Sequence, residues 1–238
     1  MINILSHYKK LLFYLLHRFE PGNYKKMRFY LSNILVEDVA PFIDLHGKRV
    51  LDVGGSSGEF SAFLEKKFQC SSVNLDPFPP KKSFKNTVKA FADKIPFKEN
   101  SFDFVICRGV IEHIPTGKRV VSVNEMYRVL KRGGVAYFVV PPWFNPHAGH
   151  MLKPFHIFPF PIAKWLRKLF FGNEVSANSY AEATLFPITF KEAEILFIKS
   201  HFKIEETLDT HLRFHFLTKI PLVRELLVPA VAFILKKP

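Results

Sequence analysis

The stretch 50-VLDVGGSSGEF-60 decides the fold of this chain. Residues 49–53 are mostly apolar and predict a buried strand, and residues 59–67 predict the start of a helix. Between them, the three glycines of segment 54–58 supply a turn that accepts positive φ angles and lets a ligand reach the main chain. The turn therefore predicts a ligand site, and Asp52 places a carboxylate at its mouth.

Two familiar phosphate-binding loops do not match this turn. The dinucleotide fingerprint GxGxxG fails because Ser56 and Glu59 occupy the third and sixth positions after Gly54. The P-loop pattern GxxxxGK[ST] fails because no lysine follows Gly58. An acid such as Asp52 would repel a phosphate and attract an ammonium group. We therefore expect a ligand with an ammonium and a carboxylate, and not a pyrophosphate.

The segments that follow alternate between strands and helices. SSVNLDPF predicts a strand that ends at Asp76, whose carboxylate could accept hydrogen bonds from two ribose hydroxyls. A further strand is predicted at residues 102–107. NEMYRVLKR then predicts a helix with Gly133–Gly134 as its C-cap, before a strand at residues 135–140. This alternation predicts an α/β fold with a doubly wound, mostly parallel sheet and a ligand at the carboxyl ends of its strands.

Over residues 48–142 the chain resembles the class I S-adenosylmethionine (SAM)-dependent methyltransferases of the methyltransferase type 11 kind. Four motifs occur in the family's order, although Ser56 stands where the family usually has glycine. The resemblance implies a Rossmann-like fold with a seven-stranded sheet, SAM as cofactor and methyltransferase activity. It also implies that Asp76 holds the ribose. The other cofactor residues it implies are Asp52, Gly54, Gly55, Ser56, Gly58, Cys107 and Arg108 around the methionine part, and Ala92 and Asp93 at the adenine.

A cap is predicted after the fifth strand, in residues 143–187. This insertion holds ten aromatic residues in 45, and its prolines prevent much regular secondary structure. We expect it to cover the SAM pocket. Residues 164–171 mix apolar and basic side chains, which predicts contact with a membrane surface and its headgroups.

The cap also carries candidate catalytic histidines. No HExxH motif occurs and no carboxylate lies within residues 143–159, so no metal site is expected. An imidazole suits a general base for a hydroxyl acceptor, which favours His150 first and His147 second. The alternative is that these histidines only hydrogen-bond an irregular loop. In EHIP, His113 is expected to pack and not to act as a base.

The two ends of the chain are apolar and basic. Residues 1–46 are predicted to form an N-terminal helical extension, because apolar side chains from Ile4 to Phe19 recur at helical spacing beside basic ones. Residues 47–238 form the predicted methyltransferase domain, with RFHFLTK as its seventh strand and an apolar helix at 221–236. No apolar run reaches the roughly 20 residues that a membrane span needs.

The formal net charge of +13 favours an anionic membrane or a polyanionic partner. Our leading hypothesis is methyl transfer to an oxygen of a hydrophobic or lipid-linked small molecule or glycan. The protein would be cytoplasmic, with peripheral contact at the inner membrane face through residues 1–20, 164–171 and 221–236. The sequence indicates no oligomeric state.

Two alternative functions remain open. An RNA or tRNA methyltransferase would explain the charge, but no RNA-binding module is recognisable and the basic residues are spread, so nucleic acid is not the expected partner. A non-catalytic SAM-binding or membrane-associated scaffold is the other alternative. The complete set of Asp52, Asp76 and Asp93 argues against lost cofactor binding.

Overall fold

The computed structural model describes residues 4–17, 20 and 22–238. It divides into two compact units, Met1–Leu45 and His46–Pro238, which are described separately. The sequence predicted a boundary between residues 46 and 47. Phe19, the last residue of the predicted amphipathic helix, lies outside the described residues.

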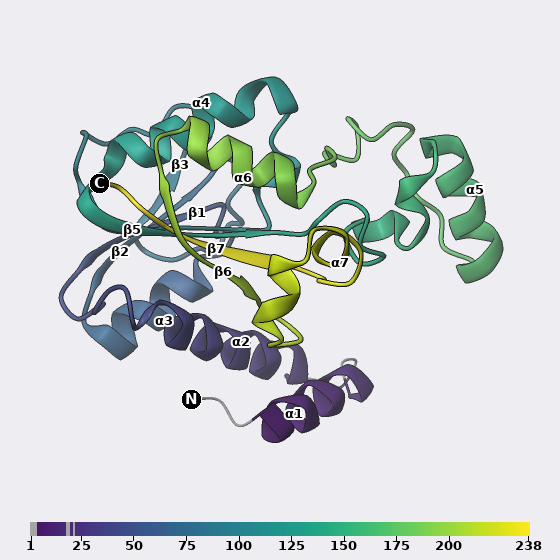
Figure 1. The fold of residues 1–238 in the computed structure, drawn as a ribbon, viewed down its shortest axis with the longest axis horizontal. Coiled ribbons are helices and arrows are strands. Elements are labelled where there is room, and N and C mark those ends of the chain that lie inside the picture. Colours follow the sequence, from purple (N-terminus) through teal and green to yellow (C-terminus); the bar gives the residue numbers. More distant parts are fainter. Residues whose placement is uncertain (1–3, 18–19, 21) are drawn as a thin grey trace. The chain divides into compact units, whose positions relative to one another are not determined.

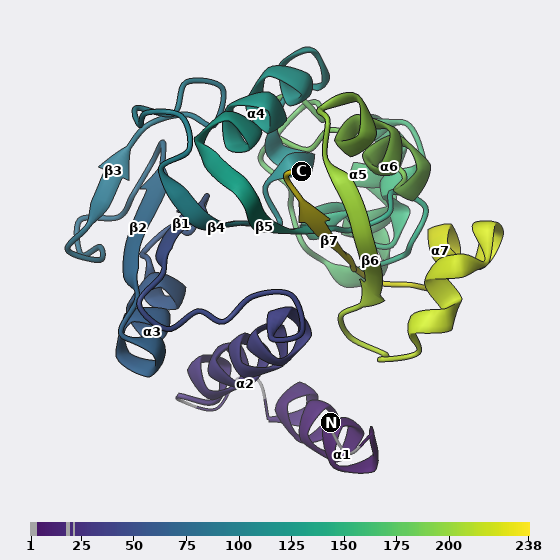
Figure 2. The ribbon, with the colours of Figure 1, turned by 60° about the vertical axis from the view of Figure 1, so that its left-hand side comes forward.

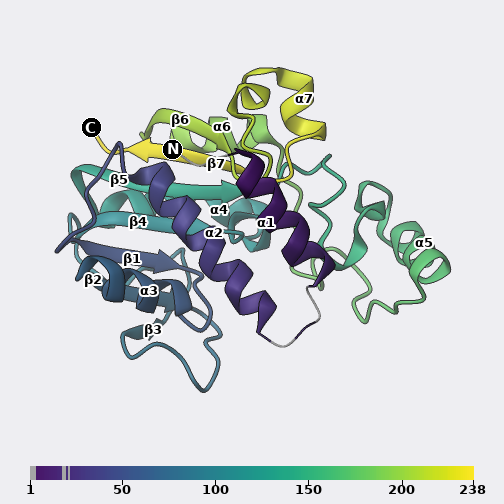
Figure 3. The same ribbon diagram turned by 90° about the horizontal axis from the view of Figure 1, so that it is seen from below.

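The first unit contains two helices, α1 (Ile4–Leu16) and α2 (Asn23–Val39), which lie beside each other in Figure 3. His7 and Tyr30 join them, because the Nδ1 atom of His7 lies 2.9 Å from the Tyr30 hydroxyl. The apolar side of α1 leaves several large side chains exposed: Leu5, Leu12, Phe13 and Leu16. Among the residues described, no helix has the length and apolar character needed to cross a membrane.

Within the described residues of the second unit, seven strands form one sheet in the order β3-β2-β1-β4-β5-β7-β6 (Figure 2). The pairings are parallel except that β7 runs antiparallel to both β5 and β6. The predicted doubly wound, mostly parallel sheet is confirmed. The strands are β1 (Arg49–Val53), β2 (Ser71–Asp76), β3 (Thr87–Lys89), β4 (Phe102–Arg108), β5 (Leu130–Val140), β6 (Lys203–Asp209) and β7 (Val231–Lys236).

Helices cover both faces of this sheet (Figure 1). Helix α3 (Glu59–Phe68) lies on one face, while α4 (Thr116–Val129) and α6 (Phe190–Lys199) lie on the other. Between α6 and the sheet, aromatic rings pack closely, with Phe197 4.7 Å from Phe138 and 5.0 Å from Phe233 between ring centroids. The core therefore accounts for part of the 27 phenylalanines of the chain.

Helix α6 begins at a capping box. The Thr189 hydroxyl accepts a hydrogen bond from the Glu192 N–H (3.1 Å), and the Glu192 carboxylate accepts one from the Thr189 N–H (2.8 Å). Two N–H groups that the helix itself cannot satisfy are thus paired. Thr189 is therefore the N-cap of α6.

The predicted apolar helix at 221–236 is wrong. A short helix, α7 (Pro221–Leu226), ends before Pro229, and Val231–Lys236 forms β7 between β5 and β6. The residues from 231 to 235 are buried in the sheet, which removes them from any membrane contact. A short apolar run bounded by proline fits a buried strand as well as a helix, and periodicity alone does not distinguish the two.

Two neighbouring predictions also need correction. RFHFLTK does not supply the seventh strand, because most of it forms the 3₁₀ turn His215–Lys219. Gly133–Gly134 do not cap α4, which ends at Val129 and runs directly into β5. Gly133 has a φ of +71° inside β5, where the register with β4 shifts, so the glycines form an irregularity in the strand.

The cap contains two 3₁₀ turns, His150–Leu152 (η2) and Phe155–Ile157 (η3), and helix α5 (Phe160–Phe171). Figure 1 shows α5 beyond the end of the sheet. The Tyr180 hydroxyl donates to the carbonyl oxygens of His156 and Phe158 at 2.5 and 2.7 Å, which fixes the loop before α5. A small separate core holds the cap together: Leu152, Phe160, Ala163, Val175 and Ala177.

Candidate active site

The glycine turn lies where the sheet changes direction. From β1 the chain proceeds outward through β2 to β3, and it then returns to place β4 on the other side of β1. Val53 at the end of β1 pairs with Cys107 near the end of β4. The carboxyl ends of β1 and β4 form the topological switch point, where ligands bind in open α/β sheets.

Left-handed backbone shapes the turn. Gly54, Ser56 and Gly58 have φ angles of +72°, +52° and +73°. A side chain at Gly54 would collide with Val110, whose Cγ2 atom would lie 2.3 Å from the added Cβ. Ser56 adopts the backbone that glycine favours, and its N–H donates to the Asp76 carboxylate at 2.9 Å. The serine therefore keeps the turn's geometry.

Two buried oxygens lie against the turn at Gly55. A Cβ added there would lie 2.3 Å from Asn74 Oδ1 and 2.5 Å from Asp52 Oδ2. The Asp52 carboxylate is 2% exposed and accepts a hydrogen bond from the Ser61 hydroxyl (3.2 Å). Asn74 donates to the Ser56 carbonyl (2.9 Å), so it supports the turn from β2. Sequence reasoning missed Asn74, although a polar residue inside the run SSVNLD was a usable signal.

Asp76 is held rigidly at the end of β2. One carboxylate oxygen accepts the Ser56 N–H, and the other accepts the Phe78 N–H at 2.8 Å. A carboxylate offers about four acceptor positions, so two remain for further donors. This arrangement suits the predicted contact with a pair of ribose hydroxyls.

Asp93 lies beside Ala92 in the loop after β3, and its carboxylate accepts a hydrogen bond from the Lys118 ammonium (2.8 Å). Two exposed aromatic rings flank the acids: Phe78 follows Asp76 by two residues, and Phe91 precedes Ala92. Their ring centroids lie 5.7 Å apart, with the rings nearly perpendicular. Sequence reasoning predicted Ala92 and Asp93 but missed the aromatic pair.

Cys107 and Arg108 occupy the end of β4, as the sequence predicted. The Cys107 side chain is fully buried in the core, and this burial raises the pKa of its thiol well above the ordinary value. The thiol therefore stays protonated and only the main chain of Cys107 could face a ligand. The Arg108 guanidinium lies 4.2 Å from the centre of the Phe60 ring, which links β4 to α3.

A carboxylate and two histidines meet next to the switch point. Glu112 lies in the 3₁₀ turn Ile111–His113 (η1), and its Oε1 atom is 3.6 Å from His150 Nε2. The rings of His113 and His150 are 4.8 Å apart between centroids. Glu112 is 3% exposed. We call these three residues the Glu–His–His cluster.

Sequence reasoning missed this cluster because it searched for an acid only within residues 143–159. His147, the second candidate base, is exposed and does not belong to the cluster. Its main-chain N–H instead donates to the Asn145 side chain (2.9 Å). The structure therefore brings only the first of the two candidate histidines next to a carboxylate.

Comparisons with known proteins agree with this geometry. The family model described as a methyltransferase domain matches residues 51–138. An uncharacterized methyltransferase of Mycobacteroides abscessus is 27% identical over 214 residues, which cover 82% of this chain and 78% of that protein. Another, from Mycobacterium sp. (strain JLS), is 34% identical over 116 residues, which are 46% of this chain and 45% of that protein. A solved SAM-dependent methyltransferase from Archaeoglobus fulgidus has a TM-score of 0.57 at 18% identity, covering 95% of this chain and 99% of that one.

Residues 51–138 are a methyltransferase domain by this match, and the relatives together with the fold support a class I SAM-dependent methyltransferase. The family match begins in β1 and ends in β5, so it includes the glycine turn and the ends of β2 and β4. The likeness to the Archaeoglobus structure shows the shared fold. The predictions of an enzyme, of this family and of SAM as the cofactor are confirmed.

The residues of the methyltransferase fit SAM at the switch point. Gly55 admits no side chain without displacing the Asn74 and Asp52 oxygens, so the main chain stays bare on the ligand side. The carboxylates of Asp52 and Asp76 suit a ligand that carries an ammonium group and ribose hydroxyls, and would oppose a phosphate. The assignment of individual residues to parts of SAM stays a prediction.

A buried arginine ties the methyltransferase's Glu–His–His cluster to the end of the cap. Arg119 of α4 donates through Nη1 to the Pro187 carbonyl (2.8 Å) and through Nη2 to the Phe186 carbonyl (2.7 Å). Its Nε donates to the carbonyls of Ile111 and Ile114 in and after η1, both at 3.2 Å. Arg119 thus positions η1 against the chain that leaves the cap.

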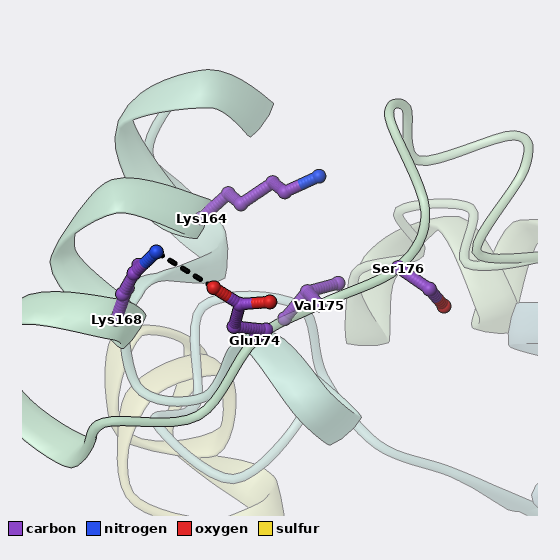
Figure 4. Close-up of a pocket in the computed structure, with 5 residues that line it drawn as sticks. All are labelled: Lys164, Lys168, Glu174, Val175 and Ser176. Atoms are coloured by element: carbon purple, nitrogen blue, oxygen red, sulfur yellow. Dashed lines mark hydrogen bonds and ion pairs between the residues drawn. The ribbon is translucent and has the colours of Figure 1, made fainter.

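A pocket on the cap of the methyltransferase lies apart from these residues (Figure 4). It is lined by Lys164, Lys168, Glu174, Val175 and Ser176. Figure 4 shows the Lys168 ammonium paired with the Glu174 carboxylate, at 2.6 Å. Lys164 donates to the Ala177 carbonyl (2.9 Å). Both ammonium groups thus contact protein oxygens, and none of the predicted SAM residues lines this pocket.

Proposed function

We propose that the methyltransferase transfers a methyl group to a hydroxyl oxygen of a hydrophobic or lipid-linked small molecule or glycan. The Glu–His–His cluster is the observation that supports oxygen as the atom that accepts the methyl group. It places a buried carboxylate 3.6 Å from an exposed imidazole, beside the switch point where SAM is expected. An amine acceptor can react through its neutral form, whereas a hydroxyl reacts faster when a neighbouring group assists loss of its proton.

Close packing connects the cluster to the glycine turn. Val110 packs on Gly54, and Glu112 Oε1 would lie 3.5 Å from a Cβ at Gly109, directly after β4. The cluster is thus within a few residues of the predicted methionine site. An acceptor hydroxyl that reaches His150 from the exposed side would also be close to the bound cofactor.

SAM supplies a methyl group on a positively charged sulfur when it is bound. In the proposed step, the acceptor oxygen forms a bond to the methyl carbon as the carbon–sulfur bond breaks, with that electron pair staying on sulfur. The hydroxyl proton leaves with help from the cluster, in which Glu112 Oε1 lies 3.6 Å from His150 Nε2. The cap's role is to exclude water and orient the acceptor.

The cap supports a hydrophobic acceptor. Helix α5 exposes large apolar side chains, with Trp165 61% and Phe170 65% accessible. Basic side chains lie among them, at Lys164, Arg167 and Lys168. Exposed aromatic and basic residues on one helix are typical of contact with a lipid surface. The apolar side chains exposed on or next to α5 are Ile157, Phe158, Ile162, Trp165, Leu169, Phe170 and Phe171.

Labelled SAM provides the test of the acceptor class. Purified protein is incubated with methyl-labelled SAM and an extract of the source cells, and the products are separated into lipid, small-molecule, RNA and protein fractions. The proposal expects label in the lipid or lipid-linked glycan fraction. Label confined to RNA would contradict it and favour the RNA alternative raised by the net charge of +13.

A further inference from the structure

Glu112 is a buried acid with one oxygen left over. Its Oε1 faces His150, while Oε2 is buried and accepts no hydrogen bond from any residue that the structure describes. A buried carboxylate without its hydrogen bonds is costly, and in native structures such a group usually marks a bound ion or a functional role. Arg119 interacts electrostatically with Glu112 but makes no hydrogen bond to this oxygen, and its Nε, Nη1 and Nη2 atoms each donate to main-chain carbonyls.

The spacing within the cluster suits a shared cation. Glu112, His113 and His150 each offer one ligand atom, and these atoms lie within 4.8 Å of one another. The 3.6 Å between Glu112 Oε1 and His150 Nε2 is long for a hydrogen bond. Ligands at roughly 2.0–2.1 Å from a tetrahedral ion are separated by about 3.3–3.5 Å, so small movements would complete the site.

His113 is oriented for coordination by its other nitrogen. Its Nδ1 lies 2.6 Å from the Thr184 carbonyl oxygen and therefore carries the proton. Nε2 then keeps its lone pair, as in metal-binding histidines whose second nitrogen donates to a carbonyl. Glu112 is also fixed, because its own carbonyl accepts the Phe186 N–H (2.8 Å).

We propose that Glu112, His113 and His150 bind a divalent first-row transition-metal ion, for which Zn²⁺ is the best match. Two imidazoles and one carboxylate form a donor set that suits such ions better than Mg²⁺ or Ca²⁺. Catalytic zinc sites use three protein ligands of this kind and leave a position for substrate. His150 is partly exposed, so the open position faces the side from which an acceptor arrives.

The role of the ion rests on the proposed function. A hydroxyl that binds the ion becomes more acidic, so its proton is released to solvent before the oxygen attacks the methyl carbon. The oxygen keeps the electron pair of the broken O–H bond and uses it to form the new bond to carbon. His150 then acts as a ligand and not as the proton acceptor.

Cobalt binding tests the site without any assay of activity. Protein that has been treated with a chelator and then freed of it is titrated with CoCl₂, and the visible absorption of Co²⁺ is followed. We expect one equivalent to bind and ZnCl₂ to displace it. Glu112→Gln and His150→Ala should each weaken binding by at least about tenfold, because each removes one of three ligands. His147→Ala, a histidine on the same loop outside the cluster, is the control and should bind as the wild type does.

Absence of stoichiometric cobalt binding by the wild type would overturn the proposal, and so would equal binding by Glu112→Gln and His150→Ala. Methyl transfer to the lipid fraction, measured with and without chelator, separates this result from the proposed function. If methyl transfer occurs without metal binding, the proposed O-methylation stands and the proposed metal site is refuted. If the cluster binds cobalt but no hydroxyl is methylated, the metal site stands and the proposed O-methylation is refuted.

Discussion

Ser56 and Gly55 show how single residues define the cofactor turn. Ser56 holds a φ of +52° because its N–H is fixed by Asp76, which offsets the cost of left-handed backbone for a residue with a Cβ. Gly55 is constrained differently, because its missing side chain leaves room for the oxygens of Asn74 and Asp52. The sequence alone shows that serine stands at position 56 of the turn. Why position 55 needs glycine becomes clear only from the structure.

Gly55→Ala should therefore damage SAM binding. The new Cβ would lie 2.3 Å from Asn74 Oδ1 and 2.5 Å from Asp52 Oδ2, so the turn or both side chains must move. We expect SAM affinity to fall by at least about tenfold, which corresponds to roughly 1.4 kcal/mol, as measured by titration calorimetry. Gly117→Ala is the matched control, because nothing lies within 4 Å of its added Cβ. Unchanged SAM affinity in Gly55→Ala would refute the role proposed for the glycine turn in SAM binding.

His150→Ala should affect turnover far more than cofactor binding. The imidazole contributes to proton loss from the acceptor, so we expect turnover to fall by about 10²–10⁴-fold. SAM affinity should stay unchanged, because none of the residues around the glycine turn is altered. Steady-state methyl transfer and SAM titration in the same preparation give both quantities. Equal turnover would remove His150 from the mechanism.

At the scale of elements, the sequence predicts most of the sheet but not its end. The strands β1, β2 and β4 have apolar runs with clear turns at their ends, so local patterning is enough. Strand β7 was predicted as a helix, because Val231–Lys236 is short and apolar and gives no periodic signal of its own. Only its position between β5 and β6 decides its conformation, and that position is a tertiary property.

The candidate site also has one part that the sequence predicts and one part that it does not. The turn and Asp76 lie close together in sequence, and their roles follow from their positions at strand ends. Glu112 and His150 belong to η1 and η2, on opposite sides of β5 in the chain. No local pattern joins them, so the sequence supplied the histidine but not its carboxylate partner.

His156 makes the cap sensitive to acid. Burial lowers the pKa of this histidine below its usual value, and its Nε2 donates to the Trp143 carbonyl at 2.7 Å. The unfolded chain, with a histidine pKa of about 6.5, then binds more protons than the folded cap. The contribution of His156 to stability is therefore complete above the unfolded pKa of about 6.5. It is lost as the pH falls below that value toward the lower pKa of the folded protein.

Comparison with His156→Gln checks this dependence. Glutamine can still donate to the Trp143 carbonyl, but it does not titrate. Urea unfolding at pH 7.5 and at pH 5.5 should show a larger loss of unfolding free energy in the wild type than in the variant. The same loss in both proteins would show that another group is responsible.

At the scale of the whole molecule, net charge and exposed apolar surface predict membrane association. The chain carries a formal charge of +13, and α5 presents Trp165, Phe170 and Phe171 to solvent. We expect sedimentation with vesicles that contain anionic lipid, weakened by salt because the charge is screened. Residues 231–235 should contribute nothing, since they are buried in β7.

The triple variant Trp165→Ser, Phe170→Ser, Phe171→Ser should lower vesicle binding by at least about tenfold, since each large apolar side chain contributes up to roughly 1.5–3 kcal/mol when buried. Lys98→Ser, Lys199→Ser on exposed positions elsewhere serves as a control for the net charge. A loss confined to the charge control would indicate electrostatic adsorption without insertion of α5.

The identity of the methylated atom tests the central claim most directly. The protein is supplied with SAM carrying a ¹³C-methyl group and with lipid extract, and the lipid product is analysed by ¹³C NMR. The account predicts a methoxyl carbon, formed by the wild type and strongly reduced in His150→Ala. A methyl group on nitrogen, sulfur or carbon, or a methoxyl signal of equal size in His150→Ala, would contradict the proposed role of the Glu–His–His cluster.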